Sequence, residues 1–172
     1  LNYRAPAAPL ITHDPYFSIW SLNDTINDDW SKHWTGKPHS ICMMARIDGK
    51  TYRFAGKEPV AEILKQVKCV INPTRTIYTF EGAGIEIKLE FLSPVIPTDP
   101  NLFSEPASYI IWTVKSIDGK QHDVSLYYDN SAEIVINEIE QEVIWGRFNL
   151  EKLDDLYMGS LDQPLLKRNG DD

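Results

Sequence analysis

The sequence has little positive charge for its length. Its 172 residues include 17 Lys and Arg against 25 Asp and Glu, which gives a formal net charge of −8. The longest basic cluster is Lys167-Arg168, and it lies beside Asp171 and Asp172. Nucleic acids and anionic membrane surfaces select basic patches, so the composition predicts no nucleic-acid partner.

Long apolar runs and cysteines are also scarce. No apolar run reaches the roughly 18 residues that a membrane-spanning helix needs, so no membrane insertion is expected. The two cysteines, Cys42 and Cys69, lie in apolar runs without CxxC spacing, which favours buried thiols, with a disulfide between them as the alternative. A chain of this length that is 42% hydrophobic can bury a core in one domain without a metal or disulfides.

Common catalytic motifs are missing as well. Ser40, Ser93 and Ser104 stand outside any G-x-S-x-G frame, and neither cysteine has a histidine close in sequence. The glycine-containing run EGAG is too short for a phosphate loop and joins two expected strands. The sequence therefore nominates no catalytic residue and no cofactor.

Aromatic residues are concentrated near the N-terminus instead. Residues 12–36, THDPYFSIWSLNDTINDDWSKHWTG, contain three of the five tryptophans and two of the four histidines. The segment keeps no lasting period of 2 or 3.6 residues, and side chains this large need to be covered. We expect residues 1–39 to form an ordered, loop-rich arm packed on a body formed by residues 40–172.

The arm supplies the candidate interface or ligand-contact residues. They are Trp20, Trp30, His33, Trp34, His13 and Asp14. The histidine spacings are irregular, unlike those of zinc sites, so no metal is expected. An acid/base pair of Asp14 with Asp28 or Asp29 stays open, because its chemistry depends on a separation in space that the sequence does not give. The aromatic side chains suit either a sugar-stacking platform or packing against a body or second domain.

From residue 40 onward the pattern is that of β-strands. Asp48-Gly49 between apolar runs predicts a hairpin, and Asp118-Gly119 predicts a second hairpin in the same way. Residues 66–72, 74–80 and 84–94 read as further strands. Ile85 and Ile87 alternate there with charged residues, as in a strand with one wet face.

Helix is expected to be scarce. Residues 150–158 fit a short helix capped by Asn149, and residues 58–66 fit a weaker one. Strands are also plausible at 132–136 and 142–148, and the proline-rich residues 93–107 should be a long surface crossing. The pattern as a whole predicts an all-β fold, an antiparallel β-sandwich with little helix.

Both ends of the chain indicate a larger parent. The start at Leu1 lacks the features of a signal peptide, and the tail ends on the turn signal Asn169-Gly170-Asp171, where a hairpin would send its second strand. We expect a processed or shortened chain whose parent continues.

Several long segments resemble the N-terminal region of the glutaminase A family, the secreted fungal and bacterial glutaminase-like proteins. The matching segments are RAPAAPLITHDPYFSIWS, DDWSKHWTG, ARIDGKTYRFAG, NPTRTIYTFEGAG, LEFLSP, SYIIWTVKSIDGKQHDVSLYYDNSAE and KRNGDD. They occur in order and cover nearly the whole chain. The resemblance implies a supersandwich-like β-domain, an extracytoplasmic location and a following (α/α)6-like helical domain.

The resemblance also implies a role for this chain. The family activity is hydrolysis of L-glutamine to L-glutamate and ammonia, but the chain matches the first part alone and is expected to be inactive by itself. The N-terminal arm is then expected to contact the helical domain, with Trp20, Trp30 and Trp34 as anchors. The alternatives are a carbohydrate- or peptide-binding module, and a catalytic fragment that uses His13 and Asp14 or the acidic residues near Asp28. A secreted parent permits, without requiring, a Cys42–Cys69 bridge.

Overall fold

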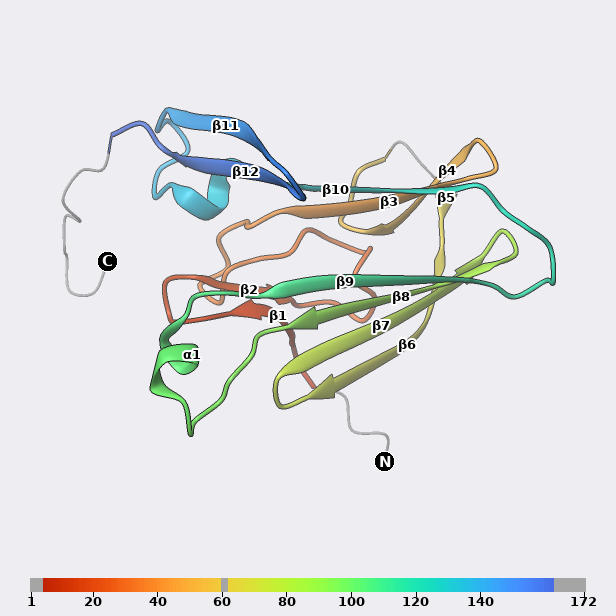
Figure 1. Ribbon diagram of the computed structural model, residues 1–172, viewed down its shortest axis with the longest axis horizontal. Coiled ribbons are helices and arrows are strands. Elements are labelled where there is room, and N and C mark those ends of the chain that lie inside the picture. The colour runs from red at the N-terminus through yellow and green to blue at the C-terminus, as the bar shows by residue number, and fades with distance from the viewer. Residues whose placement is uncertain (1–4, 60–61, 163–172) are drawn as a thin grey trace. The chain divides into compact units, whose positions relative to one another are not determined.

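The computed structural model describes residues 5–59 and 62–162 and consists mainly of β-strands (Figure 1). The described residues up to Asn130 form one compact unit, and those from Ser131 onward form a second unit. The expected all-β antiparallel sandwich is confirmed. Within the described residues, no helix is long and apolar enough to cross a membrane.

Two four-stranded sheets build the first unit, and a small two-stranded sheet from the N-terminal arm accompanies them (Figure 1). One sheet has the order β10-β3-β4-β5, with β3 (Ile41–Ile47), β4 (Lys50–Ala55), β5 (Glu62–Ile63) and β10 (Val124–Asn130). The other has the order β6-β7-β8-β9, with β6 (Lys65–Asn72), β7 (Arg75–Gly82), β8 (Ile85–Leu92) and β9 (Tyr109–Ser116). The small sheet pairs β1 (Ala8–Thr12) with β2 (Ser18–Ser21).

The core lies between the two larger sheets. On β8 the expected alternation is confirmed, because Ile85, Ile87, Leu89 and Phe91 are buried and the intervening charged residues are not. Phe54 of β4 and Phe80 of β7 meet with ring centroids 5.3 Å apart, and both are fully buried. Aromatic packing of this kind holds the two layers together through their inner faces.

The two Asp-Gly signals have different outcomes. At Asp48-Gly49 the expected hairpin is confirmed, since both residues have positive φ, 49° and 85°, and join β3 to β4. The hairpin expected at Asp118-Gly119 is wrong. β9 pairs with β8 and β10 pairs with β3, so the connection crosses from one sheet to the other. The connection runs from 117 to 123, which is too long for a two-residue turn.

The helix expected at 150–158 is also wrong. The second unit contains a hairpin of β11 (Val143–Leu150) and β12 (Leu153–Ser160). Leu150 pairs with Leu153, and Gly146 pairs with Tyr157, so Leu150, Leu153 and Tyr157 share one face of the hairpin. The same spacing suits a helical stripe, which explains the error.

Other local expectations need smaller corrections. Residues 132–136 contain a 3-10 helix (Ala132–Val135) in place of a strand, and the weaker helix expected at 58–66 is replaced at Glu62–Ile63 by β5. A short helix, α1 (Pro100–Ser104), lies in the 93–107 crossing, and the Asp99 side chain caps it by accepting from the Asn101 and Leu102 amides. The turn expected at 169–171 lies outside the described residues.

The cysteines lie in different sheets. Cys42 on β3 is buried, and burial raises the pKa of its thiol to about 11. Cys69 on β6 is exposed, so the expectation of two buried thiols is wrong for that residue. The two cysteines, both described, are not joined by a disulfide.

Gly56 marks one close approach between the arm and the sandwich. Its φ is +79°, and a Cβ placed there would lie 2.5 Å from the Ile41 carbonyl oxygen and 3.1 Å from Cζ3 of Trp30. The Gly56 amide donates to the Ile26 carbonyl at 3.2 Å. A residue without a side chain therefore lets the arm backbone and the Trp30 ring lie directly on the end of β4.

We predict that Gly56→Ala lowers the free energy of unfolding by about 2 kcal/mol or more, because it adds a clash with backbone to the strain of positive φ. Gly36→Ala is the matched control. Gly36 has φ +92°, and a Cβ added to it would meet no atom within 4 Å, so that change should cost roughly 1 kcal/mol. Chemical denaturation of both variants measures the difference, and equal losses would contradict the packing argument.

Candidate functional site

The N-terminal arm is held in a defined course by backbone hydrogen bonds. Beyond the β1–β2 hairpin, Trp20 and Lys32 exchange two backbone bonds of 2.8 and 2.9 Å, and Lys32 also bridges to Pro38. The arm residues 8–38 therefore form a small sheet with loops, which gives the candidate residues fixed positions.

Asp14 serves as a turn residue. Its Oδ1 accepts hydrogen bonds from the backbone amides of Tyr16 at 2.7 Å and Phe17 at 2.9 Å. These two N–H groups hold the pKa of the exposed carboxyl below its ordinary value of 3.8. A carboxylate stabilised in this way remains ionised near neutral pH, which suits a local cap and does not suit a general acid.

His13 lies in a hydrogen-bond chain with two serines. Its Nε2 is 3.2 Å from the Ser108 hydroxyl, which is 2.8 Å from the Ser93 hydroxyl, and the Thr12 amide donates to Ser93 at 3.5 Å. Sequence reasoning did not single out Ser108. A serine beside a histidine is the beginning of a nucleophile and base pair, but Asp14 is turned to backbone amides and does not orient the His13 ring.

His33 and Trp34 both donate to the Pro15 carbonyl. The His33 Nε2 and Trp34 Nε1 atoms lie 2.8 and 2.7 Å from that oxygen. The carbonyl accepts, so Nε2 of His33 carries a proton, while Nδ1 faces the Thr35 hydroxyl at 2.8 Å and the Thr35 amide at 3.3 Å. His33 is buried with both ring nitrogens engaged, whereas the Trp34 ring is 61% exposed.

The other two arm tryptophans have different neighbours. Trp30 packs against Gly56, as described above, and Trp20 donates its indole N–H to Ser18 at 2.6 Å. Both are partly buried. Trp30 therefore helps to seat the arm on the sandwich, and Trp20 is bonded within the arm. Trp34, together with the 59% exposed Tyr16, presents aromatic surface outward.

The acidic residues of the arm are used as ion-pair partners and turn residues. Asp29 binds Lys32 at 2.9 Å and Lys57 at 3.4 Å, and the Lys32 contact is the main reason that its pKa falls to about 2. Among the described residues, no three His, Cys, Asp or Glu side chains are grouped so that they could hold a metal ion.

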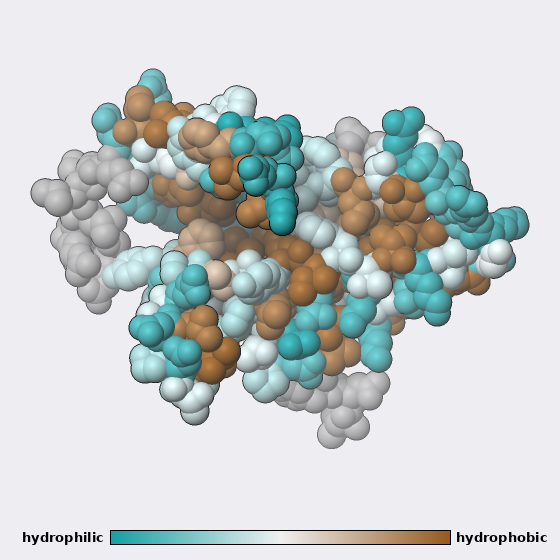
Figure 2. All heavy atoms as spheres, viewed as in Figure 1, coloured by the Kyte–Doolittle hydropathy of each residue, from teal (hydrophilic) through white to brown (hydrophobic). Residues whose placement is uncertain are grey.

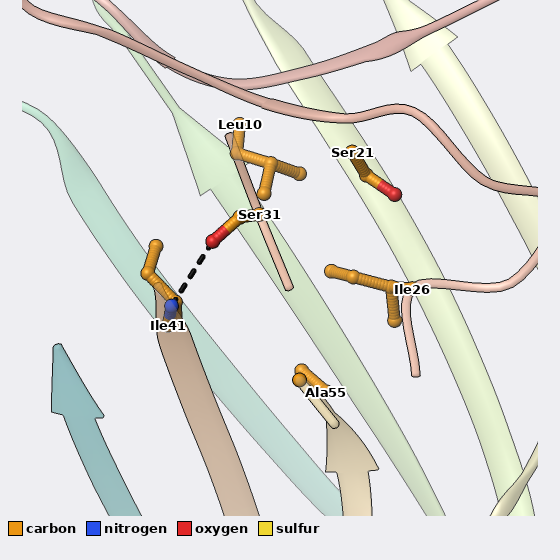
Figure 3. Close-up of a pocket in the computed structure, with 7 residues that line it drawn as sticks. Leu10, Ser21, Ile26, Ser31, Ile41 and Ala55 are labelled. Atoms are coloured by element: carbon orange, nitrogen blue, oxygen red, sulfur yellow. Dashed lines mark hydrogen bonds between the residues drawn. The ribbon is translucent and has the colours of Figure 1, made fainter. Parts of the chain in front are cut away.

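A small hollow lies where the arm meets the sandwich (Figure 3). Its lining residues are Leu10, Ser21, Ile26, Ser31, Ile41, Ala55 and Gly56. The Ser31 hydroxyl accepts from the Ile41 amide at 3.0 Å and donates to the His39 carbonyl at 2.6 Å. The hollow has no room for a water molecule, so it is a packed joint and not a ligand site.

A larger groove of about 560 Å³ opens beside β6. It is lined by Ala5, Ala8, Asn23, Asp24, Cys69, Ile71 and Tyr78. Burial is the first cause that raises the pKa of Tyr78, and this hydroxyl also bonds to Ser21 and Cys69. The groove has the size of a small-molecule site, but its tyrosine is a protonated structural group and not a base.

His122 forms an ion-paired cluster that sequence reasoning missed. Its Nδ1 lies 2.7 Å from Asp48 Oδ2 in the β3–β4 turn, and its Nε2 lies 3.0 Å from Asp118 Oδ1 after β9. A neutral imidazole has one N–H, so two carboxylate partners require the doubly protonated ring. The signal was present in the sequence as two Asp-Gly turns and one nearby histidine.

The cluster joins three connections of the first unit. Besides its bond to His122, Asp48 exchanges hydrogen bonds with the backbone of Asp123, and Asp118 accepts from the Lys120 amide at 2.9 Å. A Cβ at Gly84, in the β7–β8 turn, would lie 2.7 Å from both His122 and Asp118. The side-chain bonds of Asp118 and Asp48 raise the pKa of His122, and the bond to His122 lowers the pKa of Asp118 to about 2.

Comparison with known families identifies two domains without an assigned function. Residues 74–172 match the family described as "Domain of unknown function (DUF5127)", and residues 1–67 match "Domain of unknown function (DUF4964)". No solved structure matches the chain.

Two curated proteins are similar in sequence. "Glutaminase A" from Aspergillus oryzae is 34% identical over 138 residues, which cover 76% of this chain and 20% of that protein. "Probable glutaminase" from Arthroderma benhamiae is 28% identical over 162 residues, which cover 83% of this chain and 18% of that protein. The chain thus spans about a fifth of the length of these relatives.

The His122 cluster predicts a defined pH dependence of stability. A raised histidine pKa stabilises the fold below the ordinary value of 6.5, and this contribution is lost as the pH rises through the folded pKa. The lowered pKa values of Asp118 and Asp48 stabilise the fold above pH 3.8, their ordinary pKa. That contribution is lost as the pH falls towards 2. The difference in melting temperature between the wild type and His122→Gln should therefore be largest between about pH 4 and 6 and shrink at higher pH.

Thermal melts across pH 3 to 9 measure this difference, with His13→Gln as the control histidine outside the cluster. A His122→Gln variant whose melting temperature follows the wild type at every pH would contradict the ion-paired assignment.

Proposed function

Because the chain belongs to the DUF5127 family and is related to proteins named glutaminase, we propose that it is the non-catalytic N-terminal β-sandwich region of a glutaminase-like amidohydrolase. The relationship to the glutaminase A family expected from the sequence is confirmed by two relatives that carry the glutaminase name. The parent then hydrolyses L-glutamine to L-glutamate and ammonia, and this region supports the part that does the chemistry.

The observation that carries the proposal is that the polar candidates of the arm are hydrogen-bonded within it, whereas two of its aromatic residues are exposed. The polar candidates Asp14 and His33 are already engaged by backbone and side-chain groups of the arm itself. Trp34 and Tyr16, in contrast, are more than half exposed. An element with satisfied polar groups and outward aromatic rings fits a contact surface better than a reaction centre.

The proposed partner is the remainder of the same polypeptide. The relatives have about four-fifths of their length outside the matched region, which leaves ample chain for a second domain. We take this domain to be helical and (α/α)6-like, and the protein to be extracytoplasmic, as the family resemblance implies. Trp34 is the proposed anchor at the contact, and Trp30 holds the arm on the sandwich.

We predict that Trp34→Ala in the full-length protein lowers glutaminase activity several-fold and lowers the melting temperature, because an aromatic anchor at an interface is worth about 2 kcal/mol or more. The same change should leave the melting temperature of the 172-residue chain nearly unchanged, since Trp34 is mostly exposed there. Trp30→Ala is the comparison, and it should destabilise both forms because Trp30 packs on Gly56.

Ammonia release by the purified 172-residue chain is the control for where the activity resides. We expect none above background. Release that disappears in a Ser108→Ala variant would assign catalysis to the His13–Ser108 pair and overturn the non-catalytic role. Unchanged activity and melting of full-length Trp34→Ala would remove the interface part of the proposal.

A second candidate function is a carbohydrate- or peptide-binding module. Trp34 favours it, because its N–H is satisfied by Pro15 while its ring is open for stacking, and Tyr16 is exposed next to the same proline. Titration of the chain with a sugar panel, followed by tryptophan fluorescence, distinguishes the two functions. We expect a flat response, and a saturable change that is absent in Trp34→Ala would favour the binding module.

A further inference from the structure

β9 is an edge strand whose sequence resembles that of a central strand. In the order β6-β7-β8-β9 it pairs with β8 on one side and with no described strand on the other. Its residues YIIWTVKS include one charged side chain and are rich in β-branched and aromatic types. Strands of this composition are usually covered on both sides.

The pairing register shows which side chains lie on each face. Ile110, Trp112 and Val114 pair with the buried Phe91, Leu89 and Ile87, so they continue the inner face of the sandwich. Tyr109 and Ile111 lie on the opposite face and are 54% and 42% exposed. The neighbouring β8 has charged residues on that outer face, whereas the first half of β9 presents Tyr109 and Ile111 there.

The edge of β9 also lacks the features that protect edge strands. At two of the other edges, β5 is two residues long, and β6 has an irregular register between Gln66 and Lys68. The remaining edge, β10, pairs with β3 over seven residues without a register shift. β9 pairs with β8 over eight residues without a register shift and contains no proline. Long, regular and apolar edges are templates for another strand.

Among the described residues of the first unit, side chains of both inner faces are exposed along this edge. Trp112 of β9 and Tyr128 of β10 meet across the two sheets with ring centroids 6.2 Å apart. Val114 and Leu126, which also belong to the inner faces, are exposed. Figure 2 shows apolar side chains gathered along the region between β9 and β10. In the described part of the first unit, the core is therefore uncovered where a further strand would close it.

We propose that β9 accepts an additional strand from the remainder of the same polypeptide, which extends the β6-β7-β8-β9 sheet and closes the sandwich. This inference rests on the proposed function, because the added strand comes from the proposed remainder of the polypeptide. The relatives extend well beyond the matched region, so an extended segment of about eight residues is readily supplied in cis.

The chemistry of β9 defines the segment that fits. Its side chains facing the sandwich interior should be apolar, to cover Trp112 and Val114, and its backbone should contain no proline at a paired amide. An acidic residue opposite Lys115 would match the one charge on β9. A second copy of this chain or a covering helix would meet only part of this description, because the helix leaves the edge amides unpaired.

Amide hydrogen exchange of the full-length protein tests the proposal. In an edge strand alternate N–H groups face away from the partner and exchange quickly, whereas in a central strand consecutive groups are protected. We expect protection at consecutive amides from Ile110 to Lys115, at least about tenfold above that of the outward amides of β6 in the same molecule. β6 is the internal control because it is the opposite edge of the same sheet.

Each other result has a defined meaning. Alternating protection on β9 would overturn the added strand, even if Trp112 is shielded from fluorescence quenchers by a covering helix. Consecutive protection that depends on protein concentration would assign the strand to a second copy and overturn the source in cis. Neither result bears on the Trp34 anchor, which the activity of full-length Trp34→Ala tests separately.

Discussion

The position of the N-terminal arm depends on a buried guanidinium. Arg53 of β4 is 6% exposed, and its Nη1 donates to the Asn27 carbonyl at 2.8 Å and to the Gly56 carbonyl. A buried charge needs hydrogen-bond partners, and Nη1 of this group binds two backbone carbonyls, one in the arm and one just after β4. Gly56, whose carbonyl Arg53 binds, has positive φ and lies against the Trp30 ring.

Neighbouring polar contacts extend the same joint. The Gln66 side chain accepts from the Ile26 amide at 2.9 Å and donates to the Asp24 carbonyl at 3.1 Å, while Leu64 and Arg53 share a backbone bond of 2.9 Å. The arm is thus fixed by side chains from β4 and β6, and its aromatic residues fill the space that these bonds define. Contact candidates such as Trp34 are presented by a rigid support, which is what a recognition surface requires.

Sequence reasoning succeeded where the signal is local and failed where pairing is distant. The alternation at Ile85 to Phe91 and the turn at Asp48-Gly49 depend on neighbouring residues, and both were predicted correctly. Asp118-Gly119 has the same local signal, yet β9 and β10 pair with strands far away in the sequence. The roles of His33, Asp14 and His122 depend on partners such as Pro15, backbone amides and Asp48, which no spacing rule reveals. Leu150, Leu153 and Tyr157 fit two secondary structures equally, and cross-strand pairing decided between them.

The crossing from β9 to β10 has a consequence for the order in which the chain is made. The strands β6 to β9 follow one another as adjacent pairs, so their sheet can assemble as each strand leaves the ribosome. β3 pairs with β4 at once, but its pairing with β10 comes much later. The pairing of Ile47 with Val124 requires the whole β6-β7-β8-β9 sheet to be synthesised first. During this interval one side of β3, from Ile41 to Ile47, has no partner and exposes apolar residues. Nascent chains stalled before β10 should therefore be the species most dependent on chaperones.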